Sequence, residues 1–219
     1  MSTAPLEERT LAGLHEALSL ELDGLPREAP VLDFGCGSGA WLARLSRRGF
    51  TDLTGVDAGP RPEVAAMAFI QADLDVPWPA TGRRYRVVTM IEVIEHLANP
   101  GLALEAISGA LADDGFALVT SPNMHALRSR LRMAGSGRLA AFDDKGDPTH
   151  VTPLFLPGFL KLAARRGLAL ARAWTFPARG TQIYGRPLRI AAALLRPLVA
   201  DPLPGDTLCL RLVRHRAPG

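Results

Sequence analysis

The segment VLDFGCGSGAWL, residues 31–42, decides the fold of this 219-residue chain. A short apolar run passes through Asp33 into three alternate glycines and then into a sequence typical of a helix. Glycine lets the backbone turn sharply and lets a ligand approach without a Cβ in the way, and the free N–H groups at a helix start favour an anionic group. The segment therefore predicts a cofactor loop of the nucleotide-binding kind. Its G-x-G-x-G spacing differs from the G-x-G-x-x-G of dinucleotide-binding loops.

Acidic residues recur at the ends of the next three apolar runs. The runs LTGVD, FIQAD and YRVVTMIE end in Asp57, Asp73 and Glu92. In an open parallel sheet the carboxyl ends of the strands form one crevice, and a carboxylate about 20 residues beyond the glycine loop reaches ribose hydroxyls. We therefore expect these side chains to converge on one ligand, at the edge of a doubly wound α/β sheet.

The ordered motifs DFGCGSG, GVD, QAD and EVIEHL resemble those of the class I S-adenosylmethionine-dependent methyltransferases. Within that class they are most similar to the subgroup of ubiquinone-biosynthesis-type and natural-product or glycan O-methyltransferases. The resemblance covers residues 28–175. It implies a Rossmann-like sheet of about seven strands, mostly parallel with the last strand antiparallel, helices on both faces and a helical cap insertion.

The resemblance also implies which residues hold S-adenosylmethionine. The glycine loop would surround its methionine part, and Asp57 would bind the ribose hydroxyls. Asp73 would accept from the adenine amino group with Leu74 near the ring, although an Asp after a strand often only makes a turn. Ile91 and Glu92 would lie beneath the sulfonium. The expected cofactor contacts are Asp33, Gly35, Cys36, Gly37, Gly39, Asp57, Ala58, Asp73, Leu74, Ile91 and Glu92.

Two histidines are the candidate catalytic residues. His96 could act as a general base toward an acceptor hydroxyl, since imidazole titrates near neutral pH, or could brace the following helix. His150, in DPTHVTP, would border the acceptor pocket or be an ordinary loop histidine. Glu92, Glu95 and His96 stand at i, i+3, i+4 spacing and with His150 could hold a metal, as in the small-RNA 3′-terminal 2′-O-methyltransferases. We expect no metal, and keep metal-assisted RNA 2′-O-methylation as an alternative.

Composition agrees with one domain of this kind. With 47% hydrophobic and 21% charged residues the chain can bury a full core. No apolar run of about 18 residues and no leader is visible, so we expect a cytoplasmic protein. Cys36 and Cys209, the only cysteines, argue against disulfides and zinc sites. The net charge of +3 is spread along the chain, so we expect no nucleic-acid partner.

Hydrophobic periodicity and turn residues outline the elements. Expected helices span residues 6–22, 39–48, 100–111, 124–134, 154–166 and 187–200, with only residues 63–67 free to be helical before the third strand. Expected strands span residues 30–34, 52–57, 69–73, 85–92, 116–120, 168–174 and 207–213. We expect one domain over residues 1–219, with an N-terminal helix in residues 1–27 and cap segments at residues 124–150 and 177–206. The cap helices pack over the sheet in the preferred interpretation, and peripheral membrane contact is the alternative.

The predicted function is methyl transfer to an oxygen of a small-molecule or glycan acceptor. The acceptor follows from the family analogy alone, because a sulfonium methyl group is already electrophilic and asks little of the protein beyond positioning. A non-catalytic cofactor-binding partner protein is one alternative. A nicotinamide-dependent oxidoreductase is another, against which the G-x-G-x-G spacing and the EVIEHL segment count.

Overall fold

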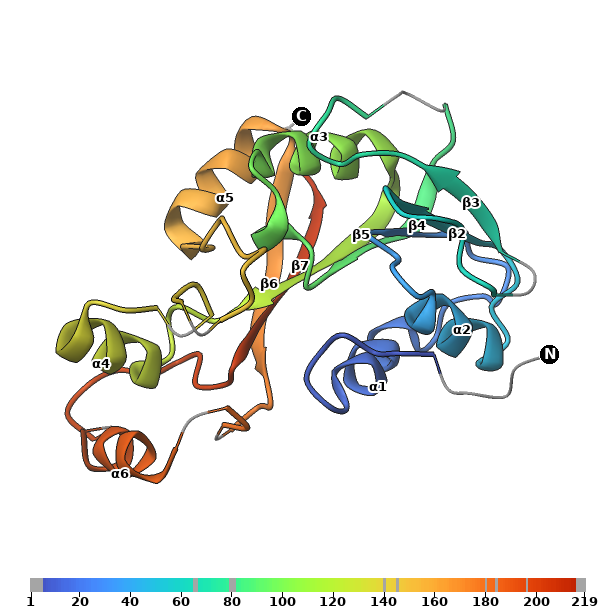
Figure 1. Cartoon of the computed structure of the whole chain (residues 1–219). Coiled ribbons are helices and arrows are strands. Elements are labelled where there is room, and N and C mark those ends of the chain that lie inside the picture. Colours follow the sequence, from blue (N-terminus) through green and yellow to red (C-terminus); the bar gives the residue numbers. More distant parts are fainter. Residues whose placement is uncertain are drawn as a thin grey trace.

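Seven strands form one sheet in the order β3-β2-β1-β4-β5-β7-β6. The computed structural model describes residues 6–64, 67–78, 82–139, 141–144, 146–179, 181–183, 185–195 and 197–215. The strands are β1 (Val31–Phe34), β2 (Leu53–Asp57), β3 (Ala68–Gln71), β4 (Tyr85–Ile91), β5 (Leu111–Pro122), β6 (Leu168–Phe176) and β7 (Thr207–Arg214). Strands β1 to β5 pair in parallel, and β7 pairs antiparallel with both β5 and β6. The predicted doubly wound sheet with an antiparallel last strand is confirmed (Figure 1).

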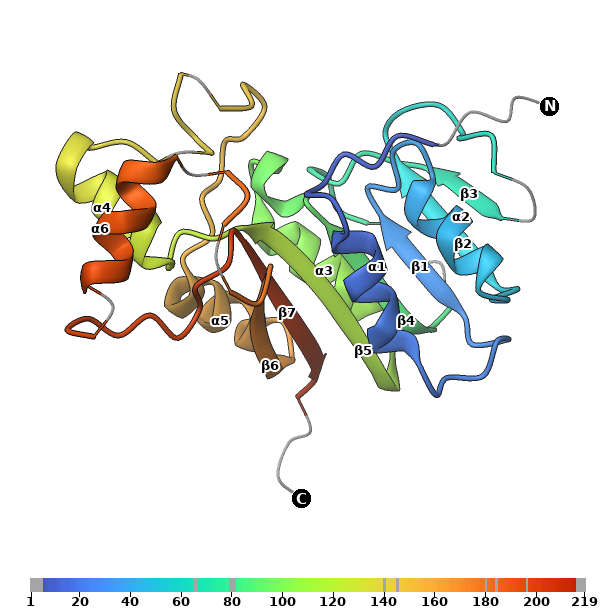
Figure 2. The same ribbon diagram turned by 90° about the horizontal axis from the view of Figure 1, so that it is seen from below.

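Helices cover both faces of this sheet (Figures 1 and 2). They are α1 (Leu14–Ser19), α2 (Ala40–Arg47), α3 (Pro100–Ala110), α4 (Leu127–Ser136), α5 (Leu156–Arg165) and α6 (Arg186–Leu195), with 3-10 turns η1 (Leu20–Leu22) and η2 (Ile94–His96). Helices α1 and α2 pack on one face over a core that includes Leu14 and Trp41, and α3 and α5 pack on the other over Leu104 and Phe159. Every residue of β1 is buried, as expected for an apolar strand between two helical layers.

Four stretches differ from the expected elements. The helix expected over residues 187–200 spans Arg186–Leu195, and residues 197–200 are not helical. The helix expected over residues 6–22 begins only at Leu14, because residues 6–13 run along the cofactor loop instead. Strand β5 begins at Leu111 rather than at residue 116, and a register shift opposite Tyr85 and Val87 absorbs the extra residues. Residues 63 and 64 are not helical, and residues 65 and 66 of that expected helix lie outside the described residues.

The two cap segments meet at one edge of the sheet. Helix α4 follows the carboxyl end of β5, whose Pro122 pairs with Thr207 at the start of β7. Helix α6 follows the carboxyl end of β6, whose Phe176 pairs with the same Thr207. Because β1, β4, β5 and β6 all run in one direction, α4 and α6 lie at the edge that also carries the glycine loop. The two helices contact each other beyond the sheet (Figure 2).

None of the helices among the described residues combines the length and the apolar character needed to cross a membrane.

Candidate functional site

The loop after β1 has the conformation that its glycines predict. Gly35, Gly37 and Gly39 have positive φ angles of 75°, 48° and 77°. A Cβ on Gly35 would lie 2.4 Å from a methyl group of Val93, so any other residue here would require Val93 to move and would strain the backbone at positive φ. A Cβ on Gly37 would meet no atom within 4 Å, which leaves the space above it open to a ligand. The loop thus presents bare backbone to the cleft and leads into α2.

Asp57 fastens this loop to the end of β2. Its Oδ2 accepts a hydrogen bond from the Gly37 N–H at 2.8 Å, and its Oδ1 accepts from the Gly59 N–H at 2.8 Å. Each oxygen keeps further acceptor capacity. The carboxylate therefore both shapes the loop and remains available to hydroxyl donors in the cleft.

Asp33 is a buried acid at the floor of the cleft. Only 3% of it is exposed, and the Thr89 hydroxyl donates to its Oδ1 at 2.6 Å. Burial raises the pKa of Asp33 to about 7, and the charge of Asp57 adds to the rise, while the bond from Thr89 lowers it. An acid in this state is stabilised by any cation that enters the cleft.

Glu92 is a second acid of this kind, one residue after β4. Its φ angle of 52° is positive, which is uncommon for a residue with a side chain. Thr120 on β5 fixes it from two sides: the Glu92 N–H donates to Thr120 Oγ1 at 3.0 Å, and the Thr120 hydroxyl donates to Glu92 Oε1 at 2.9 Å. Burial raises the pKa of Glu92 to about 7, opposed by the bond from Thr120. The cleft is therefore built to receive positive charge.

A cavity of about 840 Å³ connects these residues, a size within the range of small-molecule sites. Nine of the expected site residues line it, namely Asp33, Gly35, Cys36, Gly37, Asp57, Ile91, Glu92, His96 and His150. Cys36 lies 6% exposed with its Sγ turned toward Gly55, and burial raises its pKa to about 12, so it is a packing residue rather than a thiolate.

Four expected contacts do not line the cavity: Gly39, Ala58, Asp73 and Leu74. Gly39 is the residue before α2, where a Cβ would lie 2.5 Å from Val64. The Asp73 carboxylate accepts the Asp75 N–H at 2.9 Å, which is the turn-making alternative considered above. Leu74 is buried in the hydrophobic core. Contact of these four residues with the cofactor remains a prediction.

The N-terminal segment contributes lining residues that the sequence analysis missed. The Ser38 hydroxyl donates to the Glu7 carbonyl at 2.7 Å, and Arg44 forms an ion pair with Glu8 at 2.8 Å. These contacts hold residues 7–11 across the cleft. All the missed lining residues are Glu7, Glu8, Arg9, Thr10, Leu11, His15, Ser38, Ala40, Trp41, Val93, Asp147 and Thr149. The residues that adjoin the glycine loop or the EVIEHL segment could have been inferred from their position next to these motifs. No pattern in residues 7–15 indicates a cofactor site.

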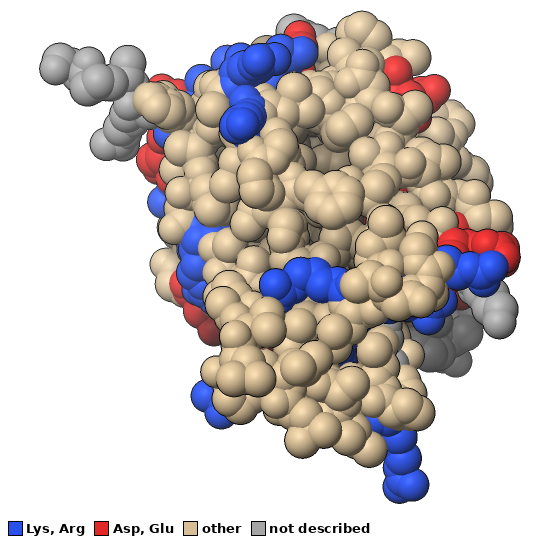
Figure 3. Space-filling model, turned by 90° about the vertical axis from the view of Figure 1, so that its left-hand side faces the viewer, with Lys and Arg blue, Asp and Glu red and all other residues tan. Residues whose placement is uncertain are grey.

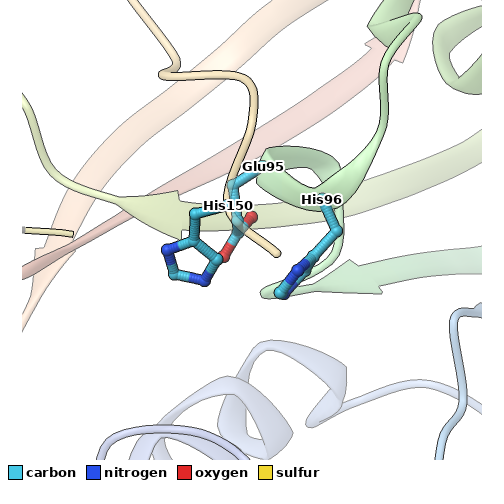
Figure 4. A group of neighbouring side chains, drawn as sticks. All are labelled: Glu95, His96 and His150. Atoms are coloured by element: carbon cyan, nitrogen blue, oxygen red, sulfur yellow. The ribbon is translucent and has the colours of Figure 1, made fainter. Parts of the chain in front are cut away.

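Glu95, His96 and His150 come together at the other end of the cavity (Figure 4). Glu95 and His96 belong to η2, and His150 comes from the loop before α5. One ligand-type atom from each lies within 4.8 Å of those of the other two. The two imidazole rings stand edge to face with centroids 4.6 Å apart, beside the carboxylate (Figure 4).

Hydrogen bonds fix the proton positions on both rings. The Thr149 hydroxyl donates its single proton to Asp147 at 2.5 Å, so the contact of 2.8 Å with His96 Nδ1 requires His96 to donate. The Ala141 carbonyl can only accept, so His150 Nδ1 donates to it at 2.8 Å. In the neutral form of each ring, Nε2 therefore carries a lone pair, to which no described residue donates a hydrogen bond. Burial lowers the pKa of His96, and His150 lowers it further, which favours this neutral form.

Neither oxygen of the Glu95 carboxylate accepts a hydrogen bond of standard geometry from the described residues, although Glu95 is fully buried. Burial, reinforced by the charge of Glu92, raises its pKa well above the ordinary value, opposed by its own backbone N–H and by the Ser121 hydroxyl. A buried carboxyl without a donor is costly unless it is protonated or meets a cation. The cluster can therefore take a proton, or combine one carboxylate oxygen with two imidazole nitrogens around a metal ion.

Comparisons with known proteins identify the family of this chain. A methyltransferase-domain family model matches residues 6–172. The ubiquinone biosynthesis O-methyltransferase of Aeromonas salmonicida is 27% identical over 136 residues, covering 56% of this chain and 57% of that protein. Its counterpart in Azorhizobium caulinodans is 30% identical over 181 residues, covering 76% and 69%. The chain thus spans little more than half of the Aeromonas relative.

A solved structure shares the fold. It is a TehB-like SAM-dependent methyltransferase from Corynebacterium glutamicum, with a TM-score of 0.59 and 20% identity, covering 94% of this chain and 89% of that one. The sheet order and the family match over residues 6–172 lead to one assignment. The chain belongs to the class I S-adenosylmethionine-dependent methyltransferases, with S-adenosylmethionine as its cofactor.

Proposed function

We propose that this chain transfers the methyl group of S-adenosylmethionine to a hydroxyl oxygen of a small-molecule or glycan acceptor. The observation that carries the proposal is that His96 and His150 both line the cofactor cavity and both use Nδ1 for a hydrogen bond within the protein, which leaves Nε2 as the acceptor atom of each neutral ring. The names of the relatives, ubiquinone biosynthesis O-methyltransferases, support oxygen as the methylated atom.

The residues divide the work by position. The cofactor supplies an electrophilic methyl group on a positively charged sulphur. Asp33 and Glu92 would favour that charge, and the loop at Gly37 with Asp57 would hold the nucleoside. Residues 7–11 cover the cleft and reduce its exposure to water.

His96 or His150 would take the proton of the acceptor hydroxyl as the oxygen attacks. The chain Asp147–Thr149–His96 fixes the ring that would do this, because each group donates to the one before it. A positioned base of this kind contributes about 10²- to 10⁴-fold to the rate. Neutral imidazoles are ready to accept a proton near pH 7.

The test is a panel of acceptors with isotopically labelled S-adenosylmethionine and mass-spectrometric location of the methyl group. The panel covers phenols, catechols, sugar hydroxyls, amines and a single-stranded RNA with a free 2′-hydroxyl. We expect transfer to oxygen, a loss of at least about 100-fold in kcat for His96→Asn or His150→Asn, and cofactor affinity within about twofold of wild type. Exposed His215 provides the control, His215→Asn. Methylation at nitrogen or carbon, or full rates in both variants, would refute the proposal.

A second candidate is cation-assisted transfer at the same place, favoured by the buried Glu95 carboxylate, which lies with the two imidazoles in a group of ligand-type atoms within 4.8 Å of one another. Glu95, His96 and His150 would then bind a divalent ion that holds the acceptor oxygen. Titration with Mn²⁺ or Zn²⁺ separates the two mechanisms without an acceptor. Binding that Glu95→Gln abolishes, together with turnover that EDTA removes and Mn²⁺ or Zn²⁺ restores, would establish the cation. Turnover that EDTA does not change would rule out the cation and favour a histidine as the general base.

A further inference from the structure

Apolar side chains and arginines share one surface at the free side of the cap helices. We define the α4–α6 surface by Met133, Arg186, Arg189, Ile190, Leu194 and Leu198. The apolar members are unusually exposed: Ile190 is 59%, Leu194 72% and Leu198 82% exposed. Figure 3 shows this side of the molecule as a broad uncharged surface with scattered basic groups and few acidic ones.

Helix α6 has two faces of opposite environment. Ala192 is buried, and Leu188, Ala191 and Leu195 are half-buried, at the spacing of one helical face. This inner face accounts for the packing against α4. Ile190 and Leu194, four residues apart, lie on the opposite side of the helix and are mostly exposed. Helix α6 thus has apolar residues on both sides, although α4 packs against only one of them.

The stretch of sequence that contains α6 carries charges of one sign. Residues 148–200 contain eight basic residues and no Asp or Glu. Arg186 and Arg189 are exposed and form no ion pair with any residue in the described part of the chain.

The acids that do lie near α4 are buried or paired. Asp201 and Asp143 keep 4% of their side chains exposed and bind Arg130 and Arg132. Exposed Asp144 pairs with Arg138 at 3.7 Å. Among the residues that the structure describes, no acidic side chain therefore pairs with Arg186 or Arg189.

We propose that the α4–α6 surface binds the surface of an anionic lipid bilayer. Helix α6 has ten residues, about 15 Å of helix, so it fits the plane of the interface rather than the bilayer thickness of about 30 Å. Ile190, Leu194 and Leu198 would enter the acyl boundary, and Arg186 and Arg189 would meet the lipid phosphates. The exposed apolar side chains match the acyl boundary, and the arginines beside them match the lipid phosphates. The positive charge of these arginines favours anionic over neutral lipid.

The position of the surface gives this binding a use. Both cap helices lie at the carboxyl edge of the sheet, where the cofactor cavity opens. Docking through α6 would bring that edge close to the bilayer, within reach of an amphiphilic acceptor. Membrane binding itself does not depend on which atom is methylated, and its test needs no turnover.

The test is vesicle sedimentation of the full chain. We expect binding to phosphatidylcholine vesicles containing about 30 mol% phosphatidylglycerol, little binding to phosphatidylcholine alone, and weaker binding in about 0.5 M NaCl. Ile190→Ser with Leu194→Ser should lower the affinity at least about tenfold, and Arg186→Gln with Arg189→Gln should abolish the preference for anionic lipid. Leu20→Ser is the matched control, because Leu20 is also 59% exposed, away from the cap.

A second measurement gives a positive signal on binding, so that a misfolded variant cannot be mistaken for one that fails to bind. A solvatochromic dye on Leu194→Cys should shift to the blue with anionic vesicles, whereas the dye on Leu20→Cys should not. The native thiols stay unlabelled, because burial raises the pKa of both Cys36 and Cys209. Absence of wild-type binding, equal binding to neutral vesicles, or undiminished binding of the serine variant would each overturn the proposal. A dimer that the serine variant dissociates, without vesicle binding, would assign the surface to a second copy and overturn it as well.

Discussion

Replacing Asp33 by Asn should stabilise the empty protein, by an amount that grows with pH. Folding leaves this carboxyl 3% exposed and raises its pKa from 3.8 to about 7. Above about pH 4 the unfolded chain releases the proton freely, whereas the folded protein must keep it or bury a charge. The folded state therefore binds more protons than the unfolded state in this window. Its stability falls as the pH rises from about 4 to about 7 and is constant beyond.

The magnitude follows from the pKa difference. Each pH unit of the window costs about 1.4 kcal/mol, which sums to about 4 kcal/mol at pH 8. Asn has the same shape without the charge, and its side-chain oxygen can still accept from the Thr89 hydroxyl, 2.6 Å from Asp33. Water in the open cavity softens the penalty, so we expect Asp33→Asn to gain about 2 to 4 kcal/mol at pH 8 and much less at pH 5.

Urea denaturation between pH 5 and pH 8 measures this gain. Asp113→Asn is the control, because the Asp113 side chain is 95% exposed. The gap between Asp33→Asn and wild type should widen up to about pH 7 and then level off, while the control shows no such trend. The same variant should bind S-adenosylmethionine more weakly, since it lacks the negative charge. A gap that ignores pH, or a variant less stable than wild type at pH 8, would refute the reasoning.

The remaining predictions concern the cofactor loop. Asp57→Ala should weaken S-adenosylmethionine binding by about 10- to 100-fold in calorimetric titration, because it removes charge-assisted bonds and frees the Gly37 N–H; an unchanged affinity would remove Asp57 from the site. Gly35→Ala should lose about 1 to 3 kcal/mol of stability and most cofactor affinity, because its Cβ would overlap Val93. Gly24→Ala is the control, because Gly24 also has a positive φ, 84°, but a Cβ there would meet nothing within 4 Å. Equal losses of stability in the two variants would mean that backbone strain, and not the overlap with Val93, causes the loss.

The cofactor half of the site was predictable because its signals are local. The loop, its glycines and Asp57 lie within residues 31–57, and the strand order fixes where each strand ends. Asp73 shows the limit of that reasoning. It follows a strand as predicted, but its carboxylate accepts the Asp75 N–H in a turn.

The rest of the cleft depends on contacts between distant parts of the chain. Leucines and charged residues in 6–13 have a helical spacing, yet the Ser38 hydroxyl and Arg44 bind that segment from outside. Glu95 and His96 could be read together from EVIEHL, whereas the approach of His150 depends on how residues 137–150 fold back over η2. Hydrogen bonds from Thr149 and Ala141 then decide which ring nitrogen is free. No pattern in the sequence carries that information.

The two acids of the cleft, Asp33 and Glu92, lower the stability of the empty protein, and binding of a cationic ligand gives a reason to retain them. Neutral residues in place of Asp33 and Glu92 would make the empty protein more stable, since burial raises the pKa of both acids to about 7. Their unfavourable charge becomes favourable when a sulfonium ion enters, because the ligand brings the cation that the empty site lacks. After methyl transfer the sulphur is neutral, and that compensation is lost. The same two carboxyls thus favour binding of the charged donor over retention of its uncharged product, at the expense of stability in the empty protein.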